Sequence, residues 1–475
     1  MIGRPRAAGA FALALVLALA GAGCAPVGPD YHLPQRALVN APAARGPLAG
    51  AASPAISTAP LPPGWWRLYH DSTLDGLVQS AFAANTGLRV AEAGLQQSQA
   101  LLAEARAARQ PNLSFNFDPG YALVAGAAYL LPQAVPSTWL YDIGVSASYD
   151  LDLFGGLRRG IEAAGYDDEA ARAARDLVKV TVAAEVAGAY AEVCGTGAEL
   201  TVERHTLELQ QRSLALTQAL ARGGRATRLD VTRSLGQLSQ LRANIPALLA
   251  RQRNALYRLA VLTGQPPAQY RQELARCDTF LRLDRPIPVG DGAALLARRP
   301  DVREAERHLA AYTALIGVQT AALYPSITLG ATLGSTGPAG EFLDQPTRRY
   351  SIGAGVSWQL NRNPARARIQ RAEAAQQAAL ARFDGVVLRA LQDVAVALTG
   401  YAGDLDREQE LVAARARVAA AVADAEQLQQ GGRAGALSVL DAQRTLAGVD
   451  QVLAAQRLQI SFDQVRIFLA LGGGW

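Results

Sequence analysis

Apolar and polar residues alternate without a break from Asp142 to Leu151. The apolar positions of this stretch are Ile143, Val145, Ala147, Tyr149 and Leu151. A period of two predicts a strand with one apolar face. The alternation ends at Asp152-Leu153-Phe154-Gly155-Gly156, and no proline occurs between there and Gly223.

The residues after Gly156 follow a helical period instead. One apolar stripe has steps of three and four residues: Leu177, Val180, Ala184, Ala187, Ala191 and Cys194. A second stripe lies on another side of the same helix: Val178, Val182, Val186, Ala189 and Val193. A helix of about 67 residues extends roughly 100 Å at about 1.5 Å per residue. The pattern therefore predicts a strand that runs directly into a rod with neighbours on two sides.

The same kinds of pattern precede and follow this stretch. Apolar spacing predicts a helix from Leu74 to Arg109, ended by Pro111. Leu113, Phe115 and Phe117 then alternate with polar residues, which predicts the first strand of a β-hairpin over 112–151. After the long helix, predicted over 155–222, a shorter helix is predicted over 228–263, ended by glycine and two prolines.

The second half of the chain repeats the first. Gly431-Gly432-Arg433-Ala434 echoes Gly223-Gly224-Arg225-Ala226. A second hairpin is predicted over 325–360, because apolar and small or polar residues alternate in both of its arms. A second long helix is then expected over 365–430, and a second shorter helix over 436–471. Each half thus reads helix, hairpin, long helix, shorter helix.

The N-terminus predicts export. Arg4 and Arg6 precede an apolar run from Ala10 to Ala20 that is too short to span a bilayer, which indicates a signal peptide. The run Gly21–Cys24 resembles a lipobox with an irregular first residue, so we predict cleavage before Cys24 and lipidation of its thiol. The alternative is ordinary cleavage after Ala20-Gly21-Ala22. Residues 25–63 are rich in proline and alanine and predict an extended tether without a core.

The predicted organisation follows from these boundaries. The segments are a signal peptide over 1–23, a lipid-anchored tether over 24–63, a first repeat over 64–268, a linker over 269–290 and a second repeat over 291–475.

Composition and charge exclude several classes of protein. The net charge of +5 falls to +3 without the two leader arginines, which is too little to argue for binding of nucleic acid. The three cysteines fit neither a disulfide framework nor a paired metal site, and Cys194 on its helical stripe is expected to be a small buried hydrophobe. The four histidines are far apart, and no nucleophile elbow or P-loop occurs. We therefore predict no enzyme activity, no metal and no cofactor.

Four strands of about ten residues match the pattern of outer-membrane β-barrels. Four strands cannot close a barrel, and an open sheet edge in lipid costs several kcal/mol per unsatisfied backbone group. Several chains must therefore contribute strands to one barrel. The helices of both repeats then project to one side, the periplasm, and the turns at Gly223-Gly224 and Gly431-Gly432 form their far tips.

Several short motifs carry a family resemblance. They are the runs Cys24–Tyr31, Trp65-Trp66, Asp150–Gly155, Arg298–Arg303, Tyr324–Ser326, Leu440–Arg444 and Leu471–Trp475. In this order and spacing they resemble the TolC-type efflux outer-membrane lipoproteins, the OprM and NodT branch. The run Leu360–Arg366 departs from the family, which usually has a glycine-containing turn before the second long helix.

The resemblance implies a fold and a set of partners. The expected fold is an α+β membrane protein in which a homotrimer shares a twelve-stranded transmembrane β-barrel and a periplasmic barrel of long antiparallel helices. The expected function is the passive exit duct of a tripartite efflux pump. Its partners are an inner-membrane RND-type transporter, a periplasmic adaptor and the outer-membrane lipid. Alternatives are a duct for polypeptide secretion and a periplasmic adaptor or scaffold lipoprotein; an adaptor, however, lacks the four alternating segments.

The tips carry the candidate functional residues. The predicted adaptor-docking residues are Gly223, Gly224, Arg225, Gly431, Gly432 and Arg433. A closed duct needs a constriction, and the predicted gate residues are Asp230, Arg233, Asp441, Arg444, Leu229 and Leu440. In each acid–arginine pair the three-residue spacing places both groups on one helical face, where they bond each other or reach a neighbouring helix. Solvated contacts within one helix explain the same spacing.

Overall fold

The structure is a computed structural model that describes residues 26–123 and 137–473. These residues form two compact units. Unit 1 contains 26–34, Leu95–Ala171 and Ala305–Phe383, and unit 2 contains Gln35–Gly94, Arg172–Glu304 and Asp384–Trp475 up to residue 473. The predicted signal peptide and Cys24 lie outside the described residues.

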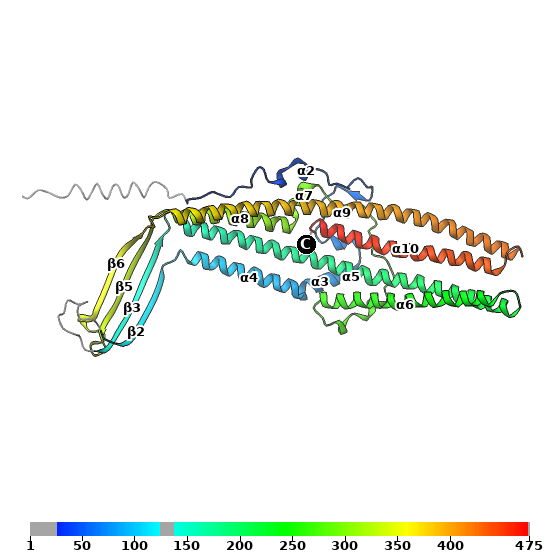
Figure 1. Ribbon diagram of the computed structural model, residues 1–475, viewed down its shortest axis with the longest axis horizontal. Coiled ribbons are helices and arrows are strands. Elements are labelled where there is room, and N and C mark those ends of the chain that lie inside the picture. Colours follow the sequence, from blue (N-terminus) through cyan, green and yellow to red (C-terminus); the bar gives the residue numbers. More distant parts are fainter. Residues whose placement is uncertain (1–25, 124–136, 474–475) are drawn as a thin grey trace, which may run out of the picture. The chain divides into compact units, whose positions relative to one another are not determined.

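Unit 1 is built around one antiparallel sheet (Figure 1). Its strands, in the order in which they pair, are β2 (Asn112–Ala122), β3 (Thr138–Leu151), β5 (Ser326–Pro338) and β6 (Arg348–Ser357). Short 3₁₀ turns lie between β5 and β6: η6 (Ala339–Glu341) and η7 (Gln345–Thr347). The two predicted hairpins are thus neighbours in a single sheet, with β2 and β6 at its edges.

The register places apolar residues of all four strands in rows on one face. Phe115 pairs with Val145, Val145 with Leu333, and Leu333 with Tyr350. The side chains of this row are all exposed in the single chain, Tyr350 to 84%. Since a one-residue slip would move every side chain to the other face, the alternation of the sequence fixes this register.

Both long helices begin close to a strand of this sheet. The helix α5 (Gly156–Arg222) follows Gly155, whose φ of +76° suits glycine. Asp152 caps the first turn of α5, because its carboxylate accepts the backbone N–H groups of Leu157 and Arg158 at 3.0 and 2.8 Å. The helix α9 (Asn363–Gln430) begins without glycine. Pro364 occupies its first turn, where the missing N–H has no partner to lose.

Unit 2 contains the turns between the long helices. The helix α6 (Arg228–Leu262) follows α5, and α10 (Ala436–Ala470) follows α9; Figure 1 shows both turns at the same end of the unit. Gly224 and Gly432 have φ of +70° and +69°. Arg225 and Arg433 donate their backbone N–H to the carbonyls five residues earlier, as in a Schellman motif. The repeated glycines therefore have the same geometric role.

These turns allow a test with matched neighbours. No atom lies within 4 Å of a Cβ added at Gly432, so only its left-handed backbone opposes a side chain, whereas Gly431 has no positive φ. We expect Gly432→Ala to destabilise the protein by about 1 kcal/mol, and Gly431→Ala to leave stability unchanged. Thermal unfolding in detergent measures both. Equal melting temperatures for the two variants would show that the turn does not need the left-handed conformation.

The remaining elements of the chain are short or belong to helical hairpins. They are η1 (Leu38–Asn40), α2 (Pro42–Arg45), β1 (Ile56–Ser57), η2 (Trp65–Tyr69), α3 (Ser72–Ala84), α4 (Thr86–Ala107), η4 (Pro267–Gln269), η5 (Gln272–Arg276), β4 (Ile287–Pro288), α7 (Gly292–Arg298) and α8 (Pro300–Ala321). No helix among the described residues is long and apolar enough to span a bilayer.

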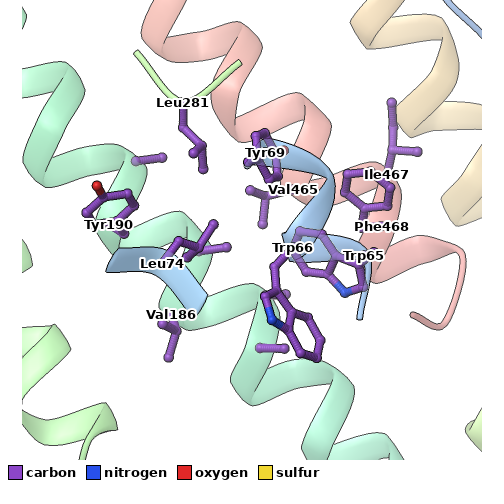
Figure 2. Close-up of a cluster of buried hydrophobic side chains, with 14 of the residues drawn as sticks. Trp65, Trp66, Tyr69, Leu74, Val186, Tyr190, Leu281, Val465, Ile467 and Phe468 are labelled. Carbon is purple, nitrogen blue, oxygen red and sulfur yellow. The ribbon is translucent and has the colours of Figure 1, made fainter. Parts of the chain in front are cut away.

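The core of unit 2 is built around two adjacent tryptophans (Figure 2). Trp65 is 1% exposed and stacks on Phe468 of α10 with ring centroids 4.5 Å apart. Trp66 packs edge-on against Phe82 of α3. The segment before α3 is thereby held against α10, although the two are about 400 residues apart along the sequence.

The structure differs from three expectations. The helix predicted over Leu74 to Arg109 is two helices, α3 and α4. Asn85 separates them, because its side chain donates to the Leu262 carbonyl at 3.0 Å and accepts the Leu88 N–H at 3.1 Å. This buried amide caps α4 and ties the break to α6. Apolar periodicity alone does not reveal such a cap.

The prediction of a tether without a core was wrong for residues 35–63. Leu48 and Leu61 are buried, and the two residues of β1 pair in parallel with β4, Ile56 opposite Ile287. The prolines keep regular helices short here, but an extended backbone still offers hydrogen bonds to another segment. The predicted linker over 269–290 is packed as well, since Ile287 and Val289 are fully buried.

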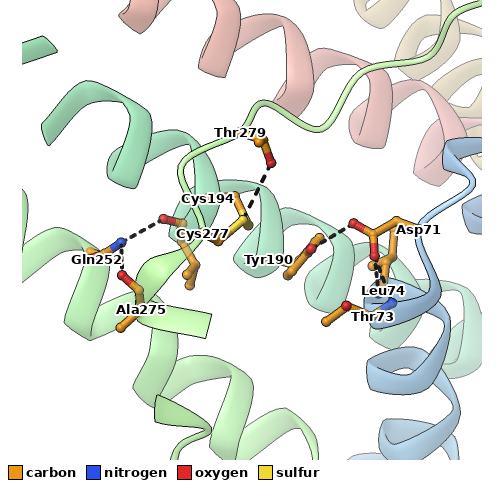
Figure 3. Close-up of a disulfide and its surroundings, with 10 residues drawn as sticks. Asp71, Thr73, Leu74, Tyr190, Cys194, Gln252, Ala275, Cys277 and Thr279 are labelled. Carbon is orange, nitrogen blue, oxygen red and sulfur yellow. Dashed lines mark hydrogen bonds between the residues drawn. A yellow bond between two sulfur atoms is a disulfide. The ribbon is translucent and has the colours of Figure 1, made fainter. Parts of the chain in front are cut away.

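Cys194 is buried as expected, but the expectation that the cysteines form no disulfide was wrong. Cys194 of α5 and Cys277 form a disulfide (Figure 3), with Cα atoms 4.6 Å apart and a sequence separation of 83. Gln252 of α6 donates to the carbonyls of Val193 and Ala275 beside it. The disulfide and this amide hold the segment after α6 against α5.

Candidate functional site

The face of the sheet opposite the apolar rows carries a hydrogen-bonded belt of polar side chains. Asp142 of β3 accepts from Asn116 of β2 at 2.7 Å, from Thr336 of β5 at 2.8 Å and from Arg349 of β6 at 2.6 Å. Arg349 also donates to the Thr336 hydroxyl at 2.8 Å. One carboxylate thus links all four strands on the polar face.

The aromatic residues divide between two environments. Tyr121, Trp139 and Tyr350 are more than half exposed on the apolar face, as expected for an aromatic belt at a membrane surface. Tyr141 is only 3% exposed, because its ring lies under Phe342 and its hydroxyl is hydrogen-bonded within the turn between β5 and β6. Tyr141 therefore does not belong to this belt.

A buried arginine in unit 1 holds the N-terminal segment. The Arg159 side chain of α5 is 3% exposed and donates to the carbonyls of Val27 and Gly28, to Asp30 at 2.7 Å and to Glu162 at 2.7 Å. Gly28 has φ of +90°, and a Cβ there would lie 2.3 Å from the Cα of Gly317. We call residues 26–31 the strap.

The far end of the strap is held by an aromatic and ionic cluster. The Tyr31 hydroxyl donates to Glu306 of α8 at 3.2 Å, and its ring contacts Tyr166 of α5 edge-on. The Arg307 guanidinium lies over both rings. The run Cys24–Tyr31 contributed only a motif to the family resemblance, and the structure gives the side chains of Asp30 and Tyr31 their partners.

The predicted docking residues at the tips are all exposed. Gly223, Gly224 and Arg225 lie in the turn between α5 and α6, and Gly431, Gly432 and Arg433 lie in the turn between α9 and α10. A Cβ at Gly224 or Gly432 would meet no atom within 4 Å. The turns of the single chain are therefore open to a partner.

The first pair of gate candidates is not joined. Asp230 belongs to the capping box of α6: it accepts the backbone N–H and the hydroxyl of Thr227 at 2.8 and 2.6 Å, while its own N–H donates to the Thr227 hydroxyl. These bonds lower the pKa of the Asp230 carboxyl below its ordinary value. Arg233 and Leu229 are exposed. Asp230 therefore caps the start of α6 with Thr227, and Arg233 takes no part in this cap.

The second pair makes a contact between helices. Arg444 lies 4.0 Å from Asp441 on the same face of α10, and it also donates to the side-chain oxygen of Gln237 on α6. Leu440 is half-buried. Gln237 was not predicted, because a glutamine on an exposed helix face has no sequence pattern of its own. Arg444 is thus the gate candidate that reaches a neighbouring helix.

A model of a known family matches residues 77–265 and 293–473, and its description is "outer membrane efflux protein". These two ranges cover more than half of the chain. The chain belongs to the outer membrane efflux protein family. The resemblance drawn from the motifs is confirmed, and so is the TolC-like fold of long helices with four antiparallel strands.

Several family members are similar over most of their length. The pyoverdine export outer membrane protein OpmQ of Pseudomonas putida is 33% identical over 443 residues, covering 90% of this chain and 92% of the relative. The toluene efflux pump outer membrane protein TtgC of Pseudomonas putida is 30% identical over 471 residues, covering 95% and 93%. The solved outer-membrane channel OprN has 32% identity and a TM-score of 0.84, covering 94% of this chain and 99% of that one.

The family membership establishes the general role. The protein is an outer-membrane channel of an efflux pump and is not an enzyme. The two repeats found in the sequence correspond to the two ranges of the family match. The polar belt, the strap and the tips are therefore parts of a transport channel.

Proposed function

We propose that three copies of this chain form one passive duct whose β-barrel contains twelve strands. The observation that carries the proposal is the four-stranded sheet, in which β2 and β6 are edges and the apolar row from Phe115 to Tyr350 is exposed in the single chain. Lipid satisfies the apolar face, and only the edges of further copies satisfy the backbone groups of β2 and β6. The polar belt around Asp142 then faces the aqueous lumen.

The duct works with two partners that supply energy and a path across the periplasm. An inner-membrane RND-type transporter drives export, and a periplasmic adaptor docks on the exposed tips. The names of OpmQ and TtgC refer to pyoverdine and toluene, which supports small organic molecules as cargo here. Cysteines introduced at Arg225 or Arg433 should cross-link to the adaptor. Links formed only near the strands would rule out docking at the tips.

We further propose that lipid on Cys24 anchors the N-terminus. The strap begins two residues later and is held to unit 1 by Arg159. The two residues span at most about 7 Å, so the anchor lies close to the start of the strap. Mass spectrometry of the mature N-terminus should find an acylated cysteine, and an unmodified terminus at Gly23 would contradict this.

Channel recording tests the duct. The mature protein in planar bilayers should give discrete conductance steps, because the barrel of three chains spans the membrane without the adaptor or the transporter. Absence of steps from protein that is correctly inserted in the bilayer would contradict the proposal.

The same recording tests the gate. Replacing both Asp441 and Arg444 with alanine should raise the open fraction by about fivefold, because exposed contacts of this kind contribute up to about 1 kcal/mol each. Cells should also become more sensitive to large antibiotics. Arg415→Ala is the matched control, since Arg415 pairs with Asp450 between α9 and α10 at 2.5 Å, away from the turn. An unchanged open fraction would place the constriction elsewhere.

A further inference from the structure

Two carboxyl groups meet between α9 and α10 in unit 2. Asp463 of α10 is 3% exposed, and Asp404 of α9 is half-buried. The facing stretches of the two helices are joined on either side of Asp463, where Gln464 donates to Tyr401 and Gln456 donates to Asp404. One oxygen of each group has a neutral donor: Gln459 donates to Asp463 Oδ1 at 3.0 Å, and Gln456 donates to Asp404 Oδ1 at 2.8 Å. Both amides come from the same face of α10.

The second oxygen of Asp463 has no such donor. Asp463 Oδ2 is fully buried and has no hydrogen-bond partner among the described residues. Arg466 lies 3.9 Å from the other oxygen, Oδ1, beyond hydrogen-bonding distance. A buried carboxylate oxygen without a donor, on a side chain that neighbours a second carboxyl group, is costly unless it carries a proton.

A neighbouring acid shows what compensation looks like in the same interface. Glu408 of α9 is also buried, but Arg282 lies 2.6 Å and Arg457 3.2 Å from its Oε1. Two guanidinium groups thus balance one carboxylate. Asp463 and Asp404 have the reverse ratio of acids to arginines, because two carboxyl groups have one arginine, Arg466, at 3.9 Å.

The charged and titratable groups around Asp463 come from three segments. They are Asp404, Tyr401 and Glu408 of α9, Arg457 and Arg466 of α10, and Arg282 and Asp284 of the segment between η5 and β4. Tyr401 accepts a hydrogen bond from Gln464. Burial, followed by the neighbouring Asp404, raises the pKa of Asp463 to about 7.

We propose that Asp463 and Asp404 share one proton through Asp463 Oδ2, and that this proton locks α9 to α10. The protonated Asp463 donates to the Asp404 carboxylate, which satisfies the orphaned oxygen and removes one of the two like charges. The lock concerns the helix pair that ends at Gly431 and Gly432. It requires only that these helices pack as described, and it does not depend on what passes through the channel.

The sign of the pH effect follows from the proton count. In the unfolded chain an aspartate loses its proton near pH 4, whereas in the folded pair Asp463 keeps it until about pH 7. Between these values the folded state binds the extra proton, so stability falls as pH rises through this range and is constant above it. The α9–α10 pair is therefore held more tightly in acidic than in alkaline medium.

Asparagine replaces the shared proton with a permanent N–H donor of nearly the same shape. Asp463→Asn should therefore be more stable than the wild type at pH 8, and its stability should not depend on pH between 5 and 8 beyond the slope of a control. Asp404→Asn should behave in the same way, since its amide reaches Asp463 from the other side. Asp450→Asn is the control, because Asp450 is on α10 but already pairs with Arg415.

The decisive measurement is infrared spectroscopy of the full-length protein in detergent, alongside unfolding at each pH. We expect a protonated-carboxyl C=O band that disappears in the wild type with a midpoint near pH 7, and that is missing in both asparagine variants but present in Asp450→Asn. A band that is unchanged in the asparagine variants, or no band in the wild type at pH 5, would overturn the proposal. If Asp463→Asn fails to fold, Asp404→Asn alone decides, through the same band and the same pH slope.

Discussion

Replacing both Cys194 and Cys277 with serine should lower the free energy of unfolding by about 4 kcal/mol. The disulfide closes a loop of 83 residues. A cross-link across a loop of this length lowers the conformational entropy of the unfolded chain and thereby stabilises the folded state by about 4 kcal/mol. Cys194 is 2% exposed, so the serine hydroxyl that replaces its sulfur also loses contact with water. Chemical unfolding in detergent measures the change.

The wild type in reductant is the matched control for this variant. Reduction should move the wild type toward the double serine variant and should leave that variant unchanged, because the described cysteines are both in the disulfide. A double variant as stable as the oxidised wild type would show that packing alone holds the segment around Cys277 against α5.

Removing the Arg159 side chain should release the strap. Arg159→Met keeps much of the side-chain volume but leaves the carbonyls of Val27 and Gly28 without their donor. We expect a local loss of about 2–3 kcal/mol, at the level of two buried groups left unsatisfied, because Asp30 and Glu162 are exposed enough to be hydrated. Hydrogen exchange at the Val27 amide, which donates to the Phe154 carbonyl at 3.1 Å, should become faster by about thirtyfold or more.

Arg158→Met is the control, since the Arg158 side chain is on the exposed side of the same turn. Its exchange rate at Val27 should equal that of the wild type. If both variants release the strap, or neither does, the position of Arg159 has no special role.

The parts of the fold that follow a regular period were predictable. The alternation between Asp142 and Leu151 corresponds to β3, and the stripe through Val180 and Ala187 corresponds to α5. The glycines of the two turns were predictable too, because a left-handed residue after a helix nearly demands glycine. In each case the structure depends on a physical requirement that residues close together in the sequence meet by themselves.

The parts that depend on contacts between distant residues were not predictable. Cys194 and Cys277 are 83 residues apart with no informative spacing, although two cysteines that remain in an exported chain are a cue to pairing. The Asn85 cap depends on the carbonyl of Leu262, and no sequence pattern near Asn85 indicates this distant contact. Packing of residues 35–63 likewise depends on a strand partner near Ile287.

The candidate site shows the same division. The tips were located from the repeated glycines. The same acid–arginine spacing, however, belongs to a helix cap at Asp230 and to a contact between helices at Arg444. The spacing is identical in both places. The difference comes from the partners: Asp230 accepts a hydrogen bond from Thr227, whereas Arg444 donates one to Gln237 of α6.

The central claim, that the edges β2 and β6 pair between copies, is tested most directly by a cross-link. Cysteines replace Ser114 on β2 and Ser351 on β6, and a second construction pairs Ser114 with Gly353. Within one chain these strands are separated by three strand spacings, about 14 Å, which exceeds the roughly 7 Å that a disulfide can bridge. Only a link between chains can form.

Oxidation of the membrane-inserted protein followed by denaturing electrophoresis gives the answer. The account predicts covalent dimers and trimers that return to monomers on reduction, with the trimer as the largest species. Monomers alone from both constructions, in protein that still conducts ions, would contradict a barrel shared between chains.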